Sequence, residues 1–199
     1  MELFEGELIG LIGPNGAGKT TSFNMLTGVY KPTEGQITFD GKVTNNMSPH
    51  QVTKSGMSRT FQNIRLFKEL TVLDNVKVAN HSLANHSVLS SILRLPTYFK
   101  GEAKMEKESL EFLKIFELDK YKDELAKNLP YGMQRRLEIA RALAAGPKLL
   151  LLDEPAAGMN PKETSALMDL IALIRKKFDL TILLIEHDMG LIMGICERI

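Results

Sequence analysis

The sequence predicts an α/β fold with a mostly parallel β-sheet, a small antiparallel hairpin and an inserted α-helical subdomain. Continuous apolar runs at residues 7–13, 149–152 and 180–185 stop at glycine or at polar residues, as buried strands do. Helical patterns separate such runs, most clearly at residues 162–178, and this alternation is typical of parallel strands covered on both faces. Residues 63–129 show helical periodicity without a strand pattern, so we expect a helical insertion there.

The first strand is expected to lead, through a glycine-rich loop, into a helix and then a hairpin. Apolar residues recur at helical spacing from residue 20 onward, and Gly28 is a natural end for that helix. Residues 31–43 alternate apolar and polar side chains around Asp40-Gly41, a dipeptide that favours tight hairpin turns. A small antiparallel element therefore follows the first helix.

The helical insertion is predicted from caps and from amphipathic spacing. Thr71 and Asp74 have capping-box spacing ahead of one helical pattern, and residues 102–118 form a second, amphipathic one. A strongly helical run follows the proline and glycine at residues 130–132. The expected division is a core of residues 1–62 and 147–199, and a helical subdomain of residues 63–146.

Composition narrows the class of protein. The 199 residues carry 25 Lys and Arg against 24 Asp and Glu, and a net charge of +1 gives no general attraction to nucleic acid or anionic lipid. The single cysteine, Cys196, rules out an internal disulfide framework, suits a reducing compartment and is expected to be a small buried side chain. The first residues lack a basic signal-peptide region, and no apolar run is long enough to span a membrane. We therefore expect a soluble, cytoplasmic protein.

Residues 13–20 read GPNGAGKT and match G-x-x-x-x-G-K-[ST], a pattern that binds nucleoside triphosphates. Its glycines permit turns that aim consecutive N–H groups at one anion. Lys19 adds a charge for the terminal phosphates, the Thr20 hydroxyl can ligate Mg²⁺, and the helix start that follows also favours anions. A glycine-rich turn with a chance lysine is the alternative, but the strand before and the helix after favour a nucleotide-binding P-loop. The candidate nucleotide-binding residues here are Gly13, Pro14, Asn15, Gly16, Ala17, Gly18, Lys19, Thr20 and Thr21.

Two acids and a histidine follow buried strands. Asp153 and Glu154 come after LLLL, and His187 comes shortly after TILLI. Ligands of open α/β sheets lie at the carboxyl ends of strands, so we expect Asp153 to hold Mg²⁺ and Glu154 to polarise an attacking water. A polar strand end that caps the next turn is the alternative for the acids, and His187 either contacts a phosphate or makes a structural hydrogen bond. The histidines without metal-site spacing, expected at the surface, are His50, His81 and His86.

Several motifs occur in a characteristic order. GPNGAGKT is followed by TFQNIRLF, YGMQRRLEIARAL, LLLLDEP, AAGMNP and IEHDM, which together span essentially the whole chain. In this combination the sequence resembles the ATP-binding subunits of ABC transporters, which implies a P-loop NTPase core of the RecA-like type. TFQNIRLFKELTVLDNV, EPAAGMNPKET and LLIEHDM look most like the LivG-type ATPases of branched-chain amino acid import systems, with LivF-type and lipopolysaccharide-export ATPases as near relatives.

The resemblance implies a role for each motif. Gln62 would contact Mg²⁺ or the attacking water, Glu154 would be the catalytic carboxylate, and His187 would contact the γ-phosphate. Residues 156–160 would form a loop that crosses a dimer interface, where Asn160 replaces the usual aspartate. The cofactors would be ATP and Mg²⁺, and the metal ligands would be Thr20, Gln62 and Asp153. The implied partners are a second ATPase subunit, identical or different, permease subunits docked on the helical subdomain at the inner face of the cell membrane, and indirectly a solute-binding protein, but no nucleic acid.

The signature of the family, usually LSGGQ, is altered here. In the family it begins a helix whose N–H groups meet the γ-phosphate bound to the partner subunit. Residues 129–134 read LPYGMQ, and a proline in the first helical turn would preserve that backbone platform. Arg135 and Arg136 would lie near phosphate, in solvent or in ion pairs between subunits. The signature residues expected at the nucleotide are Tyr131, Gly132, Met133 and Gln134.

Both ends of the chain depart from the resemblance. An adenine-stacking aromatic residue would be expected well ahead of the P-loop, and Phe4 is too close to Gly13 for that place. A further strand and helix would be expected after residue 199, so a fragment truncated at both ends is one interpretation. The alternatives to an importer ATPase are another transport ATPase such as that of lipopolysaccharide export, a non-transport ABC ATPase, a P-loop kinase, and a fragment that binds nucleotide without turnover. The solute is not encoded here, because membrane and binding-protein subunits select it.

Overall fold

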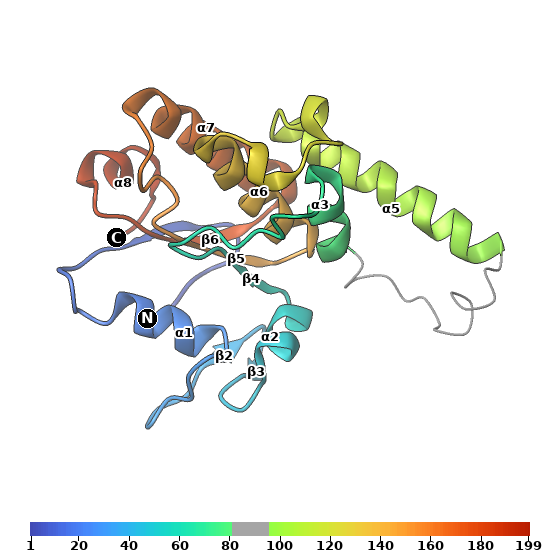
Figure 1. Ribbon diagram of the computed structural model, residues 1–199. Coiled ribbons are helices and arrows are strands. Elements are labelled where there is room, and N and C mark those ends of the chain that lie inside the picture. Colours follow the sequence, from blue (N-terminus) through green and yellow to red (C-terminus); the bar gives the residue numbers. More distant parts are fainter. Residues whose placement is uncertain (81–95) are drawn as a thin grey trace. The chain divides into compact units, whose positions relative to one another are not determined.

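The computed structural model describes residues 1–80 and 96–199, and these form two compact units (Figure 1). The first unit contains residues 1–63 and 147–199, and the second contains residues 64–146. His50, which was expected at the surface, is exposed, whereas His81 and His86 lie outside the described residues.

The first unit is built on a four-stranded sheet in the order β1-β6-β5-β4. All three pairings are parallel, and Leu150 of β5 lies opposite Ile182 of β6, which lies opposite Leu8 of β1. The strands are β1 (Leu8–Leu11), β4 (Met57–Arg59), β5 (Leu149–Asp153) and β6 (Thr181–Ile185). The predicted α/β class with a mostly parallel sheet is confirmed.

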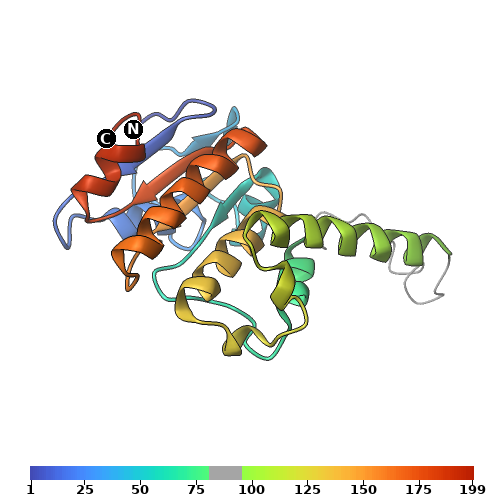
Figure 2. The same ribbon diagram turned by 90° about the horizontal axis from the view of Figure 1, so that it is seen from above.

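Helices cover both faces of this sheet (Figures 1 and 2). On one face lie α1 (Lys19–Leu26), α2 (Pro49–Ser55) and the hairpin of β2 (Thr38–Phe39) and β3 (Lys42–Val43); on the other lie α7 (Pro161–Phe178) and α8 (Met189–Ile195). Side chains alternate along a strand, so Ile9, Leu151 and Leu183 pack with Phe23 on the first face. Leu150 and Leu184, also fully buried, point to the second face. This double covering explains why the strands are apolar throughout.

Local signals fix the hairpin and the start of α7. Asp40 and Gly41 have φ angles of 50° and 72°, as a tight two-residue hairpin turn requires, and the predicted hairpin is confirmed. Asn160 Oδ1 accepts a hydrogen bond from Glu163 N at 3.0 Å, and Glu163 Oε2 accepts one from Asn160 N at 3.1 Å. This reciprocal pair is a capping box that starts α7.

Three elements of the first unit, α2, β4 and α8, were not predicted from the sequence. The residues of β4 are Met-Ser-Arg, without an apolar run, and its pairing with β5 makes it a strand. The seven residues of α8 include Gly190 and Gly194, and glycine is a poor helix former. Both elements therefore depend on tertiary contacts.

The helix α8 approaches β1 closely at Gly10. A Cβ atom at Gly10 would lie 2.8 Å from Ile192 Cγ2 and 3.2 Å from Cys196 Sγ, so only glycine fits there without a shift. Cys196 is half-buried, and not fully buried as expected. Burial raises the pKa of its thiol to about 11, so the thiol is protonated and unreactive near neutral pH.

The second unit is helical. Its helices are α3 (Val72–Asn80), α5 (Pro96–Ile115) and α6 (Tyr131–Ala144), with short 3₁₀ turns η2 (Asp119–Tyr121) and η3 (Ala126–Asn128). Val76, Phe116 and Leu137 are fully buried in its core. Thr71 Oγ1 accepts a hydrogen bond from Asp74 N at 3.0 Å and donates one to the Asp74 carboxylate at 2.7 Å, so this cap forms as the spacing predicts.

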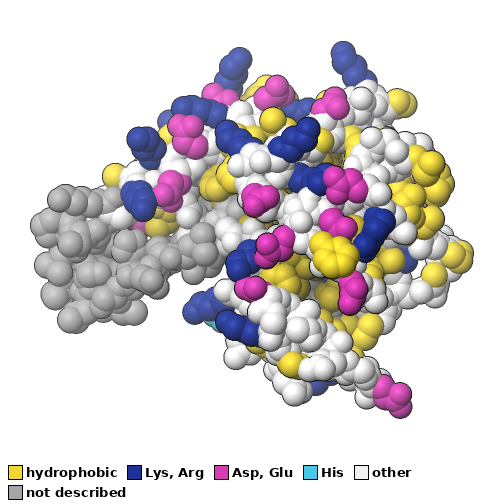
Figure 3. Space-filling view, turned by 180° about the vertical axis from the view of Figure 1, so that it is seen from behind, with side chains coloured by type: hydrophobic (Ala, Val, Ile, Leu, Met, Phe, Trp, Pro, Cys, Tyr) yellow, Lys and Arg dark blue, Asp and Glu magenta, His cyan; other side chains and the backbone are white. Residues whose placement is uncertain are grey.

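The surface carries mixed charge. On the face shown in Figure 3, Lys and Arg side chains lie among Asp and Glu side chains, in agreement with the small net charge. Within residues 1–80 and 96–199, no helix combines the length and the apolar character needed to cross a membrane.

Candidate functional site

The glycine-rich loop between β1 and α1 forms an open turn. Gly16 and Gly18 have φ angles of 83° and 86°, and a Cβ atom at either position would meet nothing within 4 Å. Glycine is therefore required by the left-handed backbone and not by crowding. Gly18 caps α1 without a side-chain hydrogen bond, and the first turn of α1 contains no acid. The loop and the helix start can thus offer backbone N–H groups to an anion.

Lys19 is folded back onto this loop. Its ammonium Nζ donates to the backbone oxygens of Gly13 at 2.6 Å and Pro14 at 3.1 Å, and the side chain is buried. The next two residues, Thr20 and Thr21, are exposed in the first turn of α1. The loop therefore holds one ammonium and presents two hydroxyl side chains to solvent.

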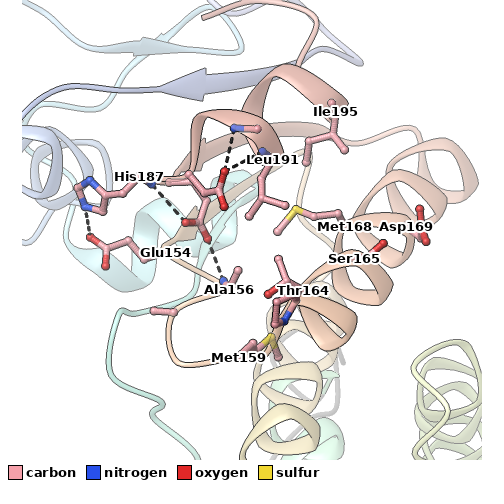
Figure 4. Close-up of a pocket in the computed structure, with 16 residues that line it drawn as sticks. Glu154, Ala156, Met159, Thr164, Ser165, Met168, Asp169, His187, Leu191 and Ile195 are labelled. Carbon is pink, nitrogen blue, oxygen red and sulfur yellow. Dashed lines mark hydrogen bonds and ion pairs between the residues drawn. The ribbon is translucent and has the colours of Figure 1, made fainter.

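Three of the predicted site residues meet at the carboxyl ends of the strands. Glu154 Oε2 accepts a hydrogen bond from Gln62 Nε2 at 2.9 Å. Glu154 Oε1 lies 2.9 Å from His187 Nε2, as Figure 4 shows. These residues follow β4, β5 and β6, as the rule for ligand sites of open α/β sheets predicts. Side-chain exposure is 17% for Glu154 and 46% for His187, so the cluster is accessible to water.

The backbone of Glu154 is strained. Its φ angle is 47°, a left-handed conformation that costs a non-glycine residue about 1–3 kcal/mol. Glu154 N donates to Ile185 O at 2.9 Å, and Ala157 N donates to Glu154 O at 3.1 Å, and these bonds hold the turn. Strain of this kind accumulates where a side chain must point in a functional direction.

Asp153, predicted to bind a metal, is already paired with a cation. Its carboxylate Oδ2 lies 2.7 Å from Arg59 Nη2, and the exposed fractions of the two side chains are 2% and 6%. The Asp153 backbone N–H donates to the Thr60 hydroxyl at 3.3 Å. Arg59 was not singled out from the sequence, because no periodicity or motif marks a lone arginine in SRTFQ.

Glu186 is a second residue that was missed. Its Oε1 accepts a hydrogen bond from Ala156 N at 2.9 Å, and its Oε2 accepts one from His187 N at 3.3 Å (Figure 4). Burial raises the pKa of this carboxyl group, against the lowering effect of the two N–H donors. Glu186 therefore ties the loop after Glu154 to the segment that carries His187. An acid directly after a buried strand was the available signal, as it was for Glu154.

The loop of residues 156–160 lines a pocket together with α7 and α8 (Figure 4). Asn160 is exposed, and its side-chain oxygen is used by the cap of α7. Asp188 Oδ1 accepts hydrogen bonds from Gly190 N at 2.8 Å and Leu191 N at 3.3 Å and starts α8. Two helices that line the pocket thus begin at side-chain caps.

The signature segment of the second unit differs from its expected form. Pro130 is the N-cap of α6 and not part of its first turn, which begins at Tyr131. Gln134 Nε2 donates to Leu129 O at 2.8 Å, and no acid or side-chain cap occupies this helix start. Gly132 and Met133 are half-buried in the first turn. The helix start consequently presents backbone N–H groups, as the resemblance implies.

The expectation for Arg135 was wrong. Its side chain is fully buried, and its Nη1 lies 2.9 Å from Glu138 Oε2. Its Nη2 also donates to the Tyr131 hydroxyl at 3.1 Å. Arg136 Nη1 pairs with Glu117 of the same chain at 2.7 Å. Both arginines follow the first turn of α6, and Arg135 lies on the side of the helix that packs into its own unit.

The donor set suits an oxygen-preferring metal. Among the described residues, no three His, Cys, Asp or Glu side chains gather as a metal cluster. The predicted ligands Thr20, Gln62 and Asp153 offer a hydroxyl, an amide and a carboxylate oxygen. This chemistry fits Mg²⁺, which is usually bound by few protein ligands together with the phosphates of a substrate.

Comparison with known proteins agrees with the motif order. The family model described as ABC transporter matches residues 1–157. The high-affinity branched-chain amino acid transport ATP-binding protein LivG of Salmonella typhimurium is 48% identical over 199 residues, which cover 100% of this chain and 78% of that protein. The ADP conformation of MJ1267, an ATP-binding cassette of an ABC transporter, has a TM-score of 0.81 at 31% identity over 98% of this chain and 76% of that one. The dimeric MJ0796 cassette bound to ADP and Pi has a TM-score of 0.79 at 28% identity, with coverages of 96% and 79%.

Proposed function

The chain belongs to the ABC transporter family of ATP-hydrolysing subunits, and from this premise we propose that it powers an importer of branched-chain amino acids. Membership makes it a nucleotide-binding protein and an ATPase. The proposed solute class is supported by similarity along the entire chain to LivG, a protein named for branched-chain amino acid transport. Lipopolysaccharide export remains the alternative within the same family.

The P-loop residues are proposed to bind the phosphates of ATP. A Cβ atom added at Gly16 or Gly18 would meet nothing within 4 Å, so the loop leaves space for an anion beside its backbone. Lys19 can exchange its two bonds to backbone oxygens for bonds to phosphate oxygens, because its ammonium has three donors on a flexible stem. Thr20, Gln62 and Asp153 would hold Mg²⁺, which when bound neutralises charge on the phosphates.

The observation that carries the catalytic proposal is the position of Glu154. Its carboxylate is partly exposed, strained in its backbone and held by Gln62 and His187. A carboxylate fixed in this way can orient a water and accept its proton. We assign the base to Glu154 and a γ-phosphate contact to His187, which would leave Glu154 when nucleotide binds.

A second subunit, identical or different, is proposed to complete the site. The start of α6, from Tyr131 to Gln134, lacks acids and a side-chain cap, so it suits the γ-phosphate on a partner subunit. Residues 156–160 would face that partner. Permease subunits would dock on the helical unit at the inner face of the membrane and receive solute from a binding protein.

The test replaces the proposed base. Glu154→Gln should reduce ATP hydrolysis by about 10²–10⁴-fold and should accumulate an ATP-bound dimer in size-exclusion chromatography. Asp123→Asn, an acid-to-amide change at a well-exposed position, is the matched control and should hydrolyse normally. Hydrolysis by Glu154→Gln at the rate of the unchanged chain would show that the base is misassigned. Phosphate release without an added acceptor separates this ATPase from a kinase.

A further inference from the structure

We propose that Arg59 is a positioning residue of the ATPase site, which holds the Asp153 carboxylate in the orientation that serves nucleotide-bound Mg²⁺. This inference rests on the proposed function of Asp153 and adds a residue that no motif marks. Arg59 lies in β4, and its guanidinium is nearly inaccessible to solvent.

Two short hydrogen bonds fix the guanidinium. Arg59 Nη2 donates to Asp153 Oδ2 at 2.7 Å, and Arg59 Nη1 donates to Asn24 Oδ1 at 2.6 Å. Bonds of this length to a charged donor are strong and directional. A single planar group therefore links the end of β5 to helix α1.

Two aromatic rings fix the plane of the same group. The Arg59 guanidinium carbon lies 5.4 Å from the ring centre of Phe23 and 5.0 Å from that of Phe61. Its Nε has no hydrogen-bond partner in the described part of the chain. Two hydrogen bonds and two aromatic rings thus orient the Arg59 guanidinium, and its Nε–H donor is not used in this arrangement.

The partners of Arg59 come from the three segments that carry the predicted metal ligands. Asn24 and Phe23 lie in α1, whose first turn contains Thr20. Phe61 directly precedes Gln62, and Asp153 is itself a predicted ligand. Arg59 thus has polar or ring contacts with all three segments. Arg59 can therefore set the relative positions of these ligands.

Electrostatics alone would not place an arginine here. The fixed positive charge of Arg59 beside Asp153 weakens the attraction of this carboxylate for Mg²⁺. Buried ion pairs also contribute little to stability compared with apolar side chains of the same size. The gain must be the orientation of a carboxylate whose side chain is only 2% exposed. Lysine could supply the charge, but it cannot bond both partners with a rigid planar fork.

The experiment measures how much Mg²⁺ strengthens nucleotide binding. A fluorescent ATP analogue is titrated into the full chain in EDTA and in Mg²⁺, with Glu154→Gln as background so that no turnover occurs. The Kd in EDTA divided by the Kd in Mg²⁺ measures how much Mg²⁺ strengthens binding. This ratio should fall by about 10–100-fold in Arg59→Met, the range found when residues that orient metal ligands are changed. Arg59→Lys should give a smaller fall and keeps the buried charge, so it remains informative if Arg59→Met folds poorly.

Arg175→Met is the matched control. Arg175 is a partly buried arginine of the same unit that donates to Gly6 O at 2.6 Å and pairs with Glu197 at 2.6 Å, away from the predicted ligands. Its loss should leave the ratio unchanged. A ratio that is unchanged or larger in both Arg59 variants, or equal losses with and without Mg²⁺, would overturn the positioning role. If the background chain itself shows no Mg²⁺ effect, the proposed metal set fails, and not the assignment of Arg59.

Discussion

Among residues 1–80 and 96–199, each unit of the protein has a buried arginine–carboxylate pair, and the two pairs have different surroundings. Arg59 and Asp153 are separated by 94 residues and join the ends of two strands in the first unit. Arg135 and Glu138 are three residues apart on one helix of the second unit. The chemistry and the burial are the same. The roles of the two pairs must therefore be inferred from the residues that surround them.

The first pair lies next to the proposed catalytic carboxylate, whereas the second pair makes contacts within the helical unit. Asp153 is followed by Glu154, a strained and partly exposed carboxylate held by two other polar side chains. The second carboxylate, Glu138, also accepts the backbone N–H of Arg65 at 3.0 Å and so secures a loop to α6. Burial alone therefore does not mark an ion pair as functional. The proposed role of the Arg59–Asp153 pair rests on its location at strand ends, in the unit that contains the P-loop.

The largest expected effect is on the stability of the second unit. Arg135→Met leaves Glu138 buried without its cation and should lower the free energy of unfolding by about 3–5 kcal/mol. Urea denaturation followed by circular dichroism measures this. The double variant Arg135→Met, Glu138→Leu should recover part of the loss, because an apolar pair replaces the ion pair, while the hydrogen bond from Arg65 N to Glu138 is removed. A single variant as stable as the unchanged chain would mean that the two pairs do not differ as described.

Helix caps give a smaller contrast between the units. Asn160→Ala and Thr71→Ala each remove a cap and should each lower the free energy of unfolding by about 1 kcal/mol. Only Asn160→Ala should also slow ATP hydrolysis, because Asn160 belongs to the loop proposed to face the partner subunit. Asn160→Asp keeps the cap and is the control. Equal hydrolysis rates in all three variants would limit Asn160 to capping.

The smallest expected effect is a change in the pH dependence of stability at Glu186. Burial raises the pKa of this carboxyl group in the folded state above its ordinary value of 4.5. At pH values between the unfolded and the folded pKa, the folded chain therefore binds more protons than the unfolded chain. The contribution of Glu186 to stability is full below the unfolded pKa and is lost as pH rises through the folded pKa. Glu186→Gln should flatten this slope in urea denaturation measured from about pH 4.5 upward. An unchanged slope would mean that another group titrates there.

The sequence by itself determined three of the four strands of the parallel sheet, the glycine-rich loop and the residue types of the site. Apolar runs, glycine positions and the acids after LLLL are local signals, because strand period and backbone conformation depend on a few neighbouring residues. These signals were sufficient to predict the α/β sheet and the hairpin, and they named Glu154 and His187. The resemblance to ABC transporter ATPases added Gln62, and the structure brings the three side chains together.

Only the tertiary structure decided which partner each charged side chain has. Whether Arg135 faces solvent or the core, and whether Arg59 meets Asp153, depends on how segments far apart in the sequence pack. The same holds for β4, whose polar residues become a strand only beside β5, and for Glu186, whose carboxylate reaches the N–H of Ala156 across 30 residues. A charged side chain has no periodicity that encodes its partner. Desolvation and hydrogen bonding in the packed protein select that partner.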